Sequence, residues 1–498
     1  MSRNVHEHKI NISELRVIMN YIGIDLGTSA VKLLLMEGSG KILKIVSREY
    51  PICFPKPGWS EQNPYDWFTQ SMDGLKELLD GTDRSLVAGI SFGGQMHGLV
   101  ALDDKDEVIR PAILWNDGRT TKECDYLNQV IGKDRLSAYT ANISFTGFTA
   151  PKVLWMKNNE PENFKKIKKI MLPKDYVAYR LSGVFATDCS DAAGTLYFDT
   201  KNRCWSETML SVLGIGEKKL PKVYESYQAV GTLKKSVADE LGLNENVKIV
   251  IGAGDNAASA IGTDTIESGD CNISLGTSGT IFVASDEFDY VPNGAIHTFC
   301  SATGKYHYLA CILSAASCQK WWVEGITKSS YDGDFAEYIG KSQVMFLPYL
   351  MGERSPINDS NIRGAFFGLS LNTTKDEMTL AVLEGVAFAI KQNLDIIRDL
   401  GIHIETSKIC GGGTRNKEWV KIIASVLNIE LLLPEVEHGA VLGAALLGAR
   451  ACLPDDGYER LKSSVKSSYT RILPDDKLVK YYGEKYSKWS ELYPKIKE

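Results

Sequence analysis

The tetrapeptide Leu-Gly-Thr-Ser occurs twice in the chain, at residues 26–29 and 275–278, and each copy stands between two apolar segments typical of β-strands. A turn of this composition directs backbone N–H groups and two hydroxyl groups at one point, and its glycine keeps that point free of side chain. Such a concave site suits a phosphate group. One copy alone is typical of an ordinary turn, but the repetition indicates architecture. Because the copies lie about half of the 498 residues apart, we expect duplicated domains with one nucleotide between them.

An aspartate, Asp255, stands where the apolar segment 247–251 gives way to a predicted helix. Two interpretations fit this position. The carboxylate is an N-cap, a place that aspartate fills well, or it is a general base at the mouth of a cleft. The flanking glycines and alanines favour the base, because they leave room for a substrate hydroxyl beside the carboxylate.

Polar side chains follow two further predicted strands, in Gln95-Met96-His97 and in Trp115-Asn116-Asp117, with Arg119 close behind. Open α/β folds bind ligands at the ends of their strands. As a group these side chains indicate a site that hydrogen-bonds a polyhydroxy substrate. Singly, His97 is more typical of a half-buried histidine and Asp117 of a turn.

A later stretch, Asp188 to Asp191, leaves two interpretations open, because its acidic and hydroxyl groups suit the lining of the same cleft and a surface loop equally well. Near the C-terminus, Gly411-Gly412-Gly413 lies between a predicted strand and a helix, with Asn416 just ahead of that helix. A triple glycine lets backbone approach a flat or anionic group, so adenine with its α-phosphate is the candidate ligand. The motifs of helix-type phosphate loops, dinucleotide folds and nucleophile elbows are absent from the sequence, which disfavours those folds.

The length suits two domains, and we place an N-terminal extension at residues 1–20, one domain at 21–262 and a second at 263–498. A net charge of −6 gives no reason to expect nucleic acid or a membrane as partner. Ten cysteines without a Cys-x-x-Cys pair are typical of reduced thiols, and no signal peptide or membrane-spanning stretch is visible. We therefore expect a cytoplasmic protein. The histidines and cysteines show no zinc spacing.

The two Gly-Thr turns, the Gly254-Asp255-Asn256 segment and the late triple glycine together resemble the FGGY carbohydrate kinases, and residues 147–156 are similar to that family's internal signature. Within the family, residues 95–98 and 115–119 are similar to the members that phosphorylate D-xylulose, whereas glycerol-phosphorylating members carry Gln-Arg-Glu-Thr at the first of these places. The resemblance covers about residues 20 to 490. It implies an α/β fold of two duplicated actin/hexokinase/Hsp70-like (ribonuclease H-like) domains with a cleft between them.

The resemblance also implies an activity: ATP-dependent phosphorylation of D-xylulose to D-xylulose 5-phosphate, with ATP and Mg²⁺ bound. Asp255 would be the catalytic base, and Asp25 would serve the phosphate and magnesium end, reaching the metal through water. The residues expected to bind the sugar are Gln95, Met96, His97, Trp115, Asn116, Asp117 and Asn256. Those expected to hold the nucleotide are Gly27, Thr28, Ser29, Lys32, Gly276, Thr277, Ser278, Gly411, Gly412, Gly413 and Asn416.

Two alternatives stay open at this point. The substrate is another ketose, a polyol or a sugar acid, such as ribulose or gluconate. Or the chain is a non-catalytic, actin-like nucleotide-binding protein, although such a protein is expected to lack the base and the polar cluster that this sequence contains. The sequence leaves open whether the protein forms a homodimer.

Overall fold

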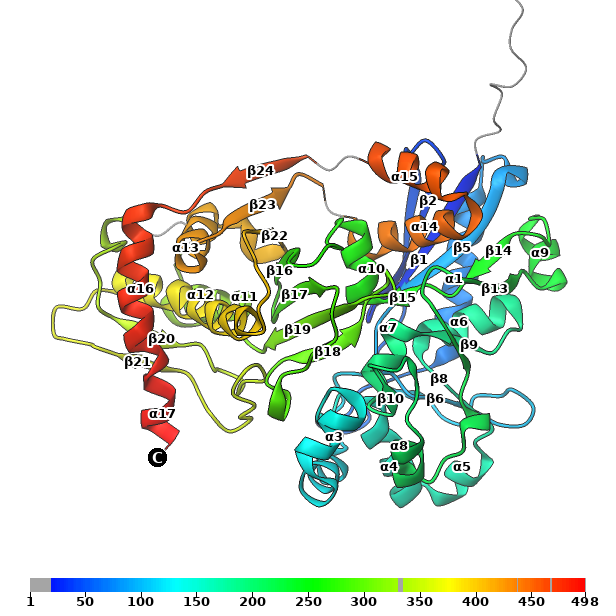
Figure 1. The fold of residues 1–498 in the computed structure, drawn as a ribbon, viewed down its shortest axis with the longest axis horizontal. Helices are drawn as coiled ribbons and strands as arrows, with labels where there is room; N and C mark the ends of the chain where they lie inside the picture. The colour runs from blue at the N-terminus through cyan, green and yellow to red at the C-terminus, as the bar shows by residue number, and fades with distance from the viewer. Residues whose placement is uncertain (1–18, 330–334, 437, 466–467, 498) are drawn as a thin grey trace, which may run out of the picture.

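The computed structural model describes residues 19–329, 335–436, 438–465 and 468–497 (Figure 1). The predicted N-terminal extension therefore lies almost entirely outside the described residues. Two seven-stranded sheets form the framework. The first contains, in spatial order, β13 (Ala229–Thr232), β14 (Lys248–Val250), β5 (Val87–Gly94), β1 (Asn20–Leu26), β2 (Ala30–Glu37) and β3 (Ile42–Glu49), with β15 (Ala253–Gly254) beside β5. The second contains β18 (His297–Cys300), β19 (Tyr306–Ile312), β17 (Gly279–Ser285), β16 (Cys271–Leu275), β22 (Thr406–Cys410), β23 (Glu430–Pro434) and β24 (Tyr469–Ile472).

The two sheets share one pattern of pairing. In the first, β3, β2 and β1 are antiparallel neighbours, β1, β5 and β14 are parallel, and β13 closes the edge antiparallel. The same sequence of directions runs through β19, β17, β16, β22, β23 and β24. The repeated Gly-Thr-Ser turn joins β1 to β2 in the first sheet and β16 to β17 in the second. The expected duplicated two-domain α/β fold is thus confirmed, and the repeat in the sequence marks equivalent points of the two sheets.

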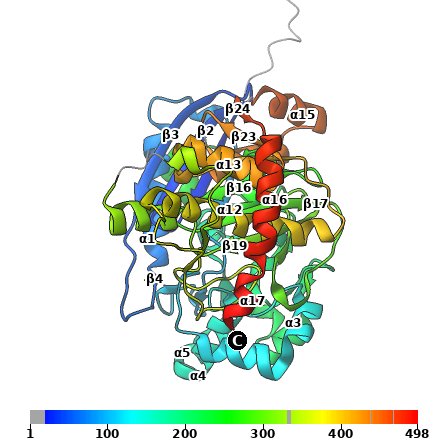
Figure 2. The same ribbon diagram turned by 90° about the vertical axis from the view of Figure 1, so that its left-hand side faces the viewer.

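Helices cover the faces of both sheets. On the first sheet, α1 (Pro64–Leu79) packs against β2 and β3. In the second half, α12 (Lys375–Asp399) begins with a capping box between Thr374 and Glu377. It packs against α13 (Lys417–Leu427) and α16 (Asp476–Ser490), which runs in front of them in Figure 2. Buried aromatic side chains fill this contact, among them Trp419 and Trp489.

One helix of the second half crosses back to the first sheet. α14 (Gly439–Cys452) lies against β1, β5 and α10 (Asp255–Gly262), beside the blue strands of Figure 1. Its small residues allow this approach: a Cβ on Gly443 would lie 1.8 Å from the carbonyl oxygen of Ala258, and one on Gly23 would lie 2.2 Å from that of Val441. The division of the chain at residue 262 stays a prediction.

Among the described residues, no helix combines the length and the apolar character that crossing a membrane requires.

The remaining elements are short. The first half also contains β4 (Glu61–Gln62), β6 (Val100–Leu102), β7 (Ala112–Ile113), α2 (Thr121–Asp125), α3 (Lys133–Thr140), α4 (Thr149–Asn159), α5 (Pro161–Lys166), β8 (Lys169–Met171), α6 (Pro173–Ser182), β9 (Ala186–Asp188), α7 (Cys189–Ala192), β10 (Phe198–Asp199), β11 (Cys204–Trp205), α8 (Glu207–Leu213), β12 (Lys222–Tyr224) and α9 (Lys235–Leu241). The second half also contains α11 (Ala316–Lys320), β20 (Met345–Leu347), β21 (Ala365–Phe367), α15 (Asp455–Ser464) and α17 (Leu492–Lys497).

Candidate active site

The first Gly-Thr-Ser turn, between β1 and β2, is held from behind by buried side chains. The Tyr50 hydroxyl donates to the carbonyl oxygen of Gly27. Gln62 donates to the carbonyl oxygen of Thr28 at 2.7 Å, and Gln95 donates to that of Gly27 at 3.3 Å. Gln95, expected to bind the sugar, therefore lies behind the turn and supports it.

A cavity of about 440 Å³ opens beside this turn and brings together Asp25, Lys32, Asp255 and Asn256. Asp25 and Lys32 are paired across β1 and β2. Burial raises the pKa of the Asp25 carboxyl to about 6, and the Lys32 ammonium opposes that rise. Four predicted site residues from three separate elements thus share one cavity.

Asp255 is the first residue of α10, and Gly254 is its N-cap. The N-cap interpretation is therefore wrong. Its Oδ1 accepts hydrogen bonds from the backbone N–H and the side-chain amide of Asn256, at 2.8 and 2.9 Å. Burial and the nearby charge of Asp25 raise the pKa of Asp255 to about 7, against the opposing effect of the Asn256 donors. A carboxylate that titrates near neutral pH, at the edge of a cavity, is suited to accept a proton.

The second Gly-Thr-Ser turn opens on a different, larger cavity of about 700 Å³. The carbonyl oxygen of Thr277 accepts hydrogen bonds from the Ala315 N–H at 3.0 Å and from the Ser317 hydroxyl at 2.7 Å. The cavity is lined from this half by the turn, α11 and the triple-glycine segment: Leu275, Gly276, Thr277, Ala316, Ser317, Gln319, Lys320, Glu324, Gly412, Gly413, Arg415 and Asn416.

The triple-glycine segment has the open backbone expected of a cradle for a flat group. Gly411 adopts a φ of +91°, and a Cβ there would lie 2.8 Å from backbone atoms of Leu275. A Cβ on Gly412 would meet nothing within 4 Å. Asn416 caps α13 by accepting the Trp419 N–H at 3.1 Å, while its Nδ2 is buried without a partner. This unpartnered donor in a roomy cavity fits a bound polar ring.

His97 and Met96 lie next to the strand that leads into Asp255. The His97 Nδ1 donates to the carbonyl oxygen of Gly194 at 2.7 Å, which leaves Nε2 as an acceptor. Burial, with the charges of Lys152 and Arg354, lowers the pKa of His97 to about 3. A Cβ on Gly254 would lie 2.9 Å from Met96 Cγ. The Met96 thioether thus lies against the residue that precedes Asp255, and the neutral His97 imidazole and this thioether share the neighbour Gly194.

Asp117 has a different environment. Its Oδ2 accepts the Ser60 N–H at 2.6 Å and an Arg119 guanidinium N–H at 2.7 Å, while Oδ1 accepts two further N–H groups of Arg119 at 2.8 and 2.9 Å. The side chains of both Asp117 and Arg119 are fully buried. The contacts of Asp117 therefore fit the interpretation that it is a turn carboxylate. Asp117 lines none of the cavities described for this structure.

The two residues before Asp117 are exposed. The Trp115 indole donates to the Thr28 hydroxyl at 3.0 Å, so it lies against the first Gly-Thr-Ser turn. Asn116 lines a separate cavity of about 490 Å³ with residues 54–60. The structure thus separates the side chains that the sequence grouped at two strand ends. Of these, Met96 packs against Gly254, the residue that directly precedes Asp255.

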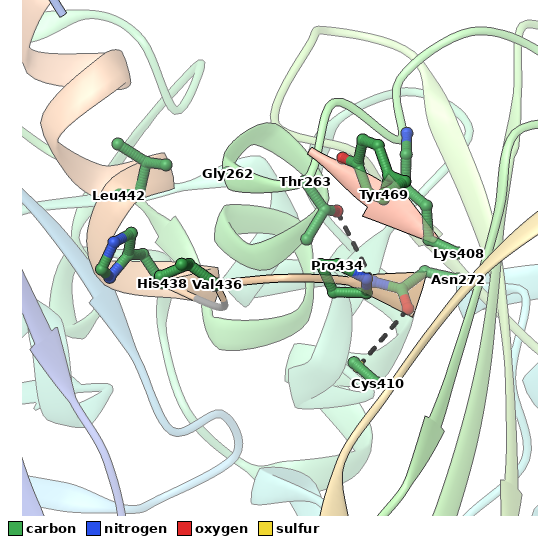
Figure 3. Close-up of a pocket in the computed structure, with 11 residues that line it drawn as sticks. Gly262, Thr263, Asn272, Lys408, Cys410, Pro434, Val436, His438, Leu442 and Tyr469 are labelled. Atoms are coloured by element: carbon green, nitrogen blue, oxygen red, sulfur yellow. Dashed lines mark hydrogen bonds between the residues drawn. The ribbon is translucent and has the colours of Figure 1, made fainter. Parts of the chain in front are cut away.

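A small cavity lies behind the site, between the end of α10 and strands β22 to β24 (Figure 3). It shares His438 and Gly439 with the Asp25–Asp255 cavity. Asn272 spans it, donating to Thr263 at 3.5 Å and accepting from Cys410 at 3.6 Å. Its volume of about 30 Å³ is room for a water molecule only, so it is not a nucleotide site.

Among the described residues, no group of three His, Cys, Asp or Glu side chains is arranged to hold a metal ion. Asp25 is the carboxylate beside the first turn. A single carboxylate fits Mg²⁺, which keeps several waters and is held largely by substrate phosphates.

Comparison with known proteins decides the family. The model of the FGGY carbohydrate kinase N-terminal domain matches residues 20–262, and that of the C-terminal domain matches residues 271–452. The chain belongs to the FGGY family of carbohydrate kinases. It is therefore a sugar kinase, a phosphotransferase, and the non-catalytic actin-like alternative is set aside.

Individual relatives of this FGGY kinase extend over nearly the whole chain. A protein named xylulose kinase from Escherichia coli (strain K12) is 37% identical over 482 residues, covering 96% of this chain and 99% of the relative. A solved structure described as a "xyloylose kinase from Brucella ovis" is 39% identical with a TM-score of 0.90, covering 96% and 99%. A gluconate kinase from Lactobacillus acidophilus is 26% identical with the same TM-score of 0.90, covering 96% and 98%.

Sequence reasoning about this FGGY kinase missed one cation near His97. Arg354 comes from the second half, lies over the Phe145 ring at 5.0 Å, and helps to lower the pKa of His97. Its neighbour Glu353 is buried, and burial raises the pKa of that carboxyl to about 8. The only signal was an acidic–basic pair inside the Pro- and Gly-bounded loop 346–356.

Proposed function

We propose that the protein transfers the γ-phosphoryl group of ATP to the terminal hydroxyl of D-xylulose, giving D-xylulose 5-phosphate. The observation that carries this is Asp255: a carboxylate with a pKa raised to about 7, on the wall of a cavity, with Met96 packed against the residue that precedes it. The sugar is supported by the relatives named xylulose kinase in Escherichia coli and other bacteria.

Asp255 acts on the sugar hydroxyl. When ionised, its free oxygen accepts the hydrogen bond of the terminal hydroxyl, and takes the proton as the hydroxyl oxygen attacks the γ-phosphorus. The Asn256 donors hold Oδ1 and so orient the carboxylate. His97 is neutral, and its Nε2 accepts a hydrogen bond from another sugar hydroxyl, while Met96 packs against an apolar edge of the chain of carbons.

The nucleotide lies along the second turn and the triple glycine. Gly276 and Thr277 present their backbone to the phosphates, with Ser278 beside them, and Gly412 leaves room for the adenine while the free Nδ2 of Asn416 donates to it. The first turn, with Gly27, Thr28, Ser29 and Lys32, receives the transferred group. Asp25 would hold Mg²⁺ through water, and that ion would supply neutralisation of the phosphate charge.

Three smaller proposals complete this picture. We place the protein in the cytoplasm, since all ten cysteines are free thiols. Its partners are the sugar and ATP, with no nucleic acid or membrane. A homodimer stays a prediction.

The test is ADP release with MgATP across D-xylulose, D-ribulose, gluconate and glycerol, for the wild type and for Asp255→Asn. We expect D-xylulose to give the highest kcat/KM and the variant to be inactive. A higher kcat/KM with gluconate or ribulose overturns the sugar but keeps the kinase. An active Asp255→Asn overturns the base.

A further inference from the structure

The stretch Asp188 to Thr195 lies beneath the site. It forms α7 and the short 3-10 turn that follows, and its side chains are buried. It is therefore not a surface loop, and none of the described cavities is lined by its residues. Its hydrogen bonds instead lead to the two residues that the proposed function places on the sugar.

The first connection runs through Ser190. Its hydroxyl accepts the backbone N–H of Gly254 at 3.1 Å and donates to Asp188 at 2.5 Å. Gly254 is the N-cap of α10 and directly precedes Asp255. The hydroxyl thus fixes the peptide from which the carboxylate of Asp255 projects.

Asp188 anchors that hydroxyl. Its Oδ2 accepts from Ser190 and, at 2.6 Å, from the Ser226 hydroxyl, while its Oδ1 pairs with Lys174 at 2.8 Å. All four side chains are fully buried. The Ser190 hydroxyl therefore has one orientation available, with its lone pair toward Gly254.

The second connection runs through Gly194. Its carbonyl oxygen accepts the Nδ1 proton of His97 at 2.7 Å, which sets the tautomer of the imidazole. A Cβ on Gly194 would lie 2.6 Å from the His97 ring and 2.9 Å from Met96 Cε. Glycine is needed here because the ring and the thioether both rest on it.

We infer that residues 188–195 are a positioning segment that aligns the base with the sugar, Ser190 by fixing the backbone ahead of Asp255 and Gly194 by orienting His97. The inference rests on the proposed function. Misplacement of a reacting group by about 1 Å costs up to about 100-fold in rate. We therefore expect removal of the Ser190 hydroxyl to lower kcat and to leave the sugar KM nearly unchanged.

Ser226→Ala is the matched control for Ser190→Ala. Each removes one buried hydroxyl from the same oxygen of Asp188, but only Ser190 contacts Gly254. We expect Ser190→Ala to lower kcat about tenfold with the sugar KM within about twofold, and Ser226→Ala to leave both within about twofold. Equal losses in the two variants, or a wild-type kcat in Ser190→Ala, overturn the inference.

A measurement independent of activity separates this inference from the proposed function. Hydrogen–deuterium exchange of the peptide spanning residues 252–256 is expected to accelerate in Ser190→Ala and not in Ser226→Ala. Unchanged exchange overturns the positioning segment even if the kinase is active, whereas accelerated exchange in a protein inactive on every sugar overturns the function alone. If Ser190→Ala does not fold, Ser190→Cys keeps the volume with a weaker acceptor and is judged by the same outcomes.

Discussion

Asp255 and Asp117 are two aspartates that follow short strands, β15 and β7, and sequence reasoning placed both on the substrate. Their surroundings differ. Asp117 is fully buried and accepts four N–H groups from Ser60 and Arg119. Within the part of the chain that the structure describes, Asp255 accepts only from Asn256, on one oxygen, and it borders a cavity. A carboxylate whose lone pairs are occupied by buried donors holds a fold together, whereas one with a free oxygen and a raised pKa is ready to take a proton.

The partners of Asp117 extend its structural role. Arg119 also pairs with Glu61 at 2.6 Å and stacks over the Trp59 ring at 3.8 Å. Glu61, in β4, in turn pairs with Arg110, so the network ties β4 to the segments on either side of β7. Breaking one member takes a partner from a buried charge. The contrast between the two aspartates is therefore open to direct test.

The largest expected effect separates the two sites by activity. Asp255→Asn keeps the shape of the side chain but removes the acceptor for the proton. We expect kcat to fall about 1,000-fold, within the range of about 100- to 10,000-fold for a lost general base, with the KM for ATP unchanged. Steady-state ADP release measures it. A variant that keeps a tenth of the wild-type kcat contradicts the assignment.

The next effect separates them by stability. Asp117→Asn removes one of the two carboxylates that pair with the buried Arg119, and Glu61 remains as the other. Because buried N–H groups then lose a charged acceptor, we expect the free energy of unfolding to fall by about 3 kcal/mol. Urea unfolding at pH 7.5, with Asn116→Ala at the exposed neighbouring position as control, measures it. If instead Asp117→Asn unfolds with the wild type and only its sugar KM rises, then Asp117 binds the substrate as the sequence suggested.

The sequence predicted the features whose signal is local or repeated. The paired Gly-Thr-Ser turns marked equivalent points of two sheets, and the capping box at Thr374 marked the start of α12. It did not predict that the Ser60 N–H donates to the Asp117 carboxylate, that α14 packs against the first sheet, or that Arg354 lies near His97. Each of these depends on a partner distant in the chain. Hydrogen-bond satisfaction is a property of tertiary structure, so two similar aspartates are indistinguishable before folding.

A smaller effect distinguishes the two sites by the direction in which stability changes. Asp117→Asn is expected to destabilise the protein, whereas Asp255→Asn is expected to stabilise it at high pH. The folded pKa of Asp255, about 7, exceeds the unfolded value of about 3.9, so the folded protein binds that proton more tightly. Stability from this group is present at acid pH and is lost as pH rises from about 4 through 7. At pH 8 Asp255→Asn is therefore expected to be more stable than the wild type, on the order of 1–3 kcal/mol, with no difference near pH 4. A destabilised variant at pH 8 contradicts the raised pKa.

The smallest effect tests whether the sugar is recognised on the Asp255 side. His97 has a φ of +69°, a conformation that asparagine tolerates better than alanine, so His97→Asn isolates the loss of the ring from backbone strain. We expect the sugar KM to rise about tenfold, near 1.4 kcal/mol, with the ATP KM unchanged. Because the pKa of His97 is about 3, this residue stays neutral, and the wild-type sugar KM is expected not to change between pH 5 and 8. In contrast, kcat/KM is expected to fall below pH 7, because Asp255 becomes protonated there. Equal losses for sugar and ATP would instead make His97 a structural residue like Asp117, since a contact made with one substrate cannot weaken both.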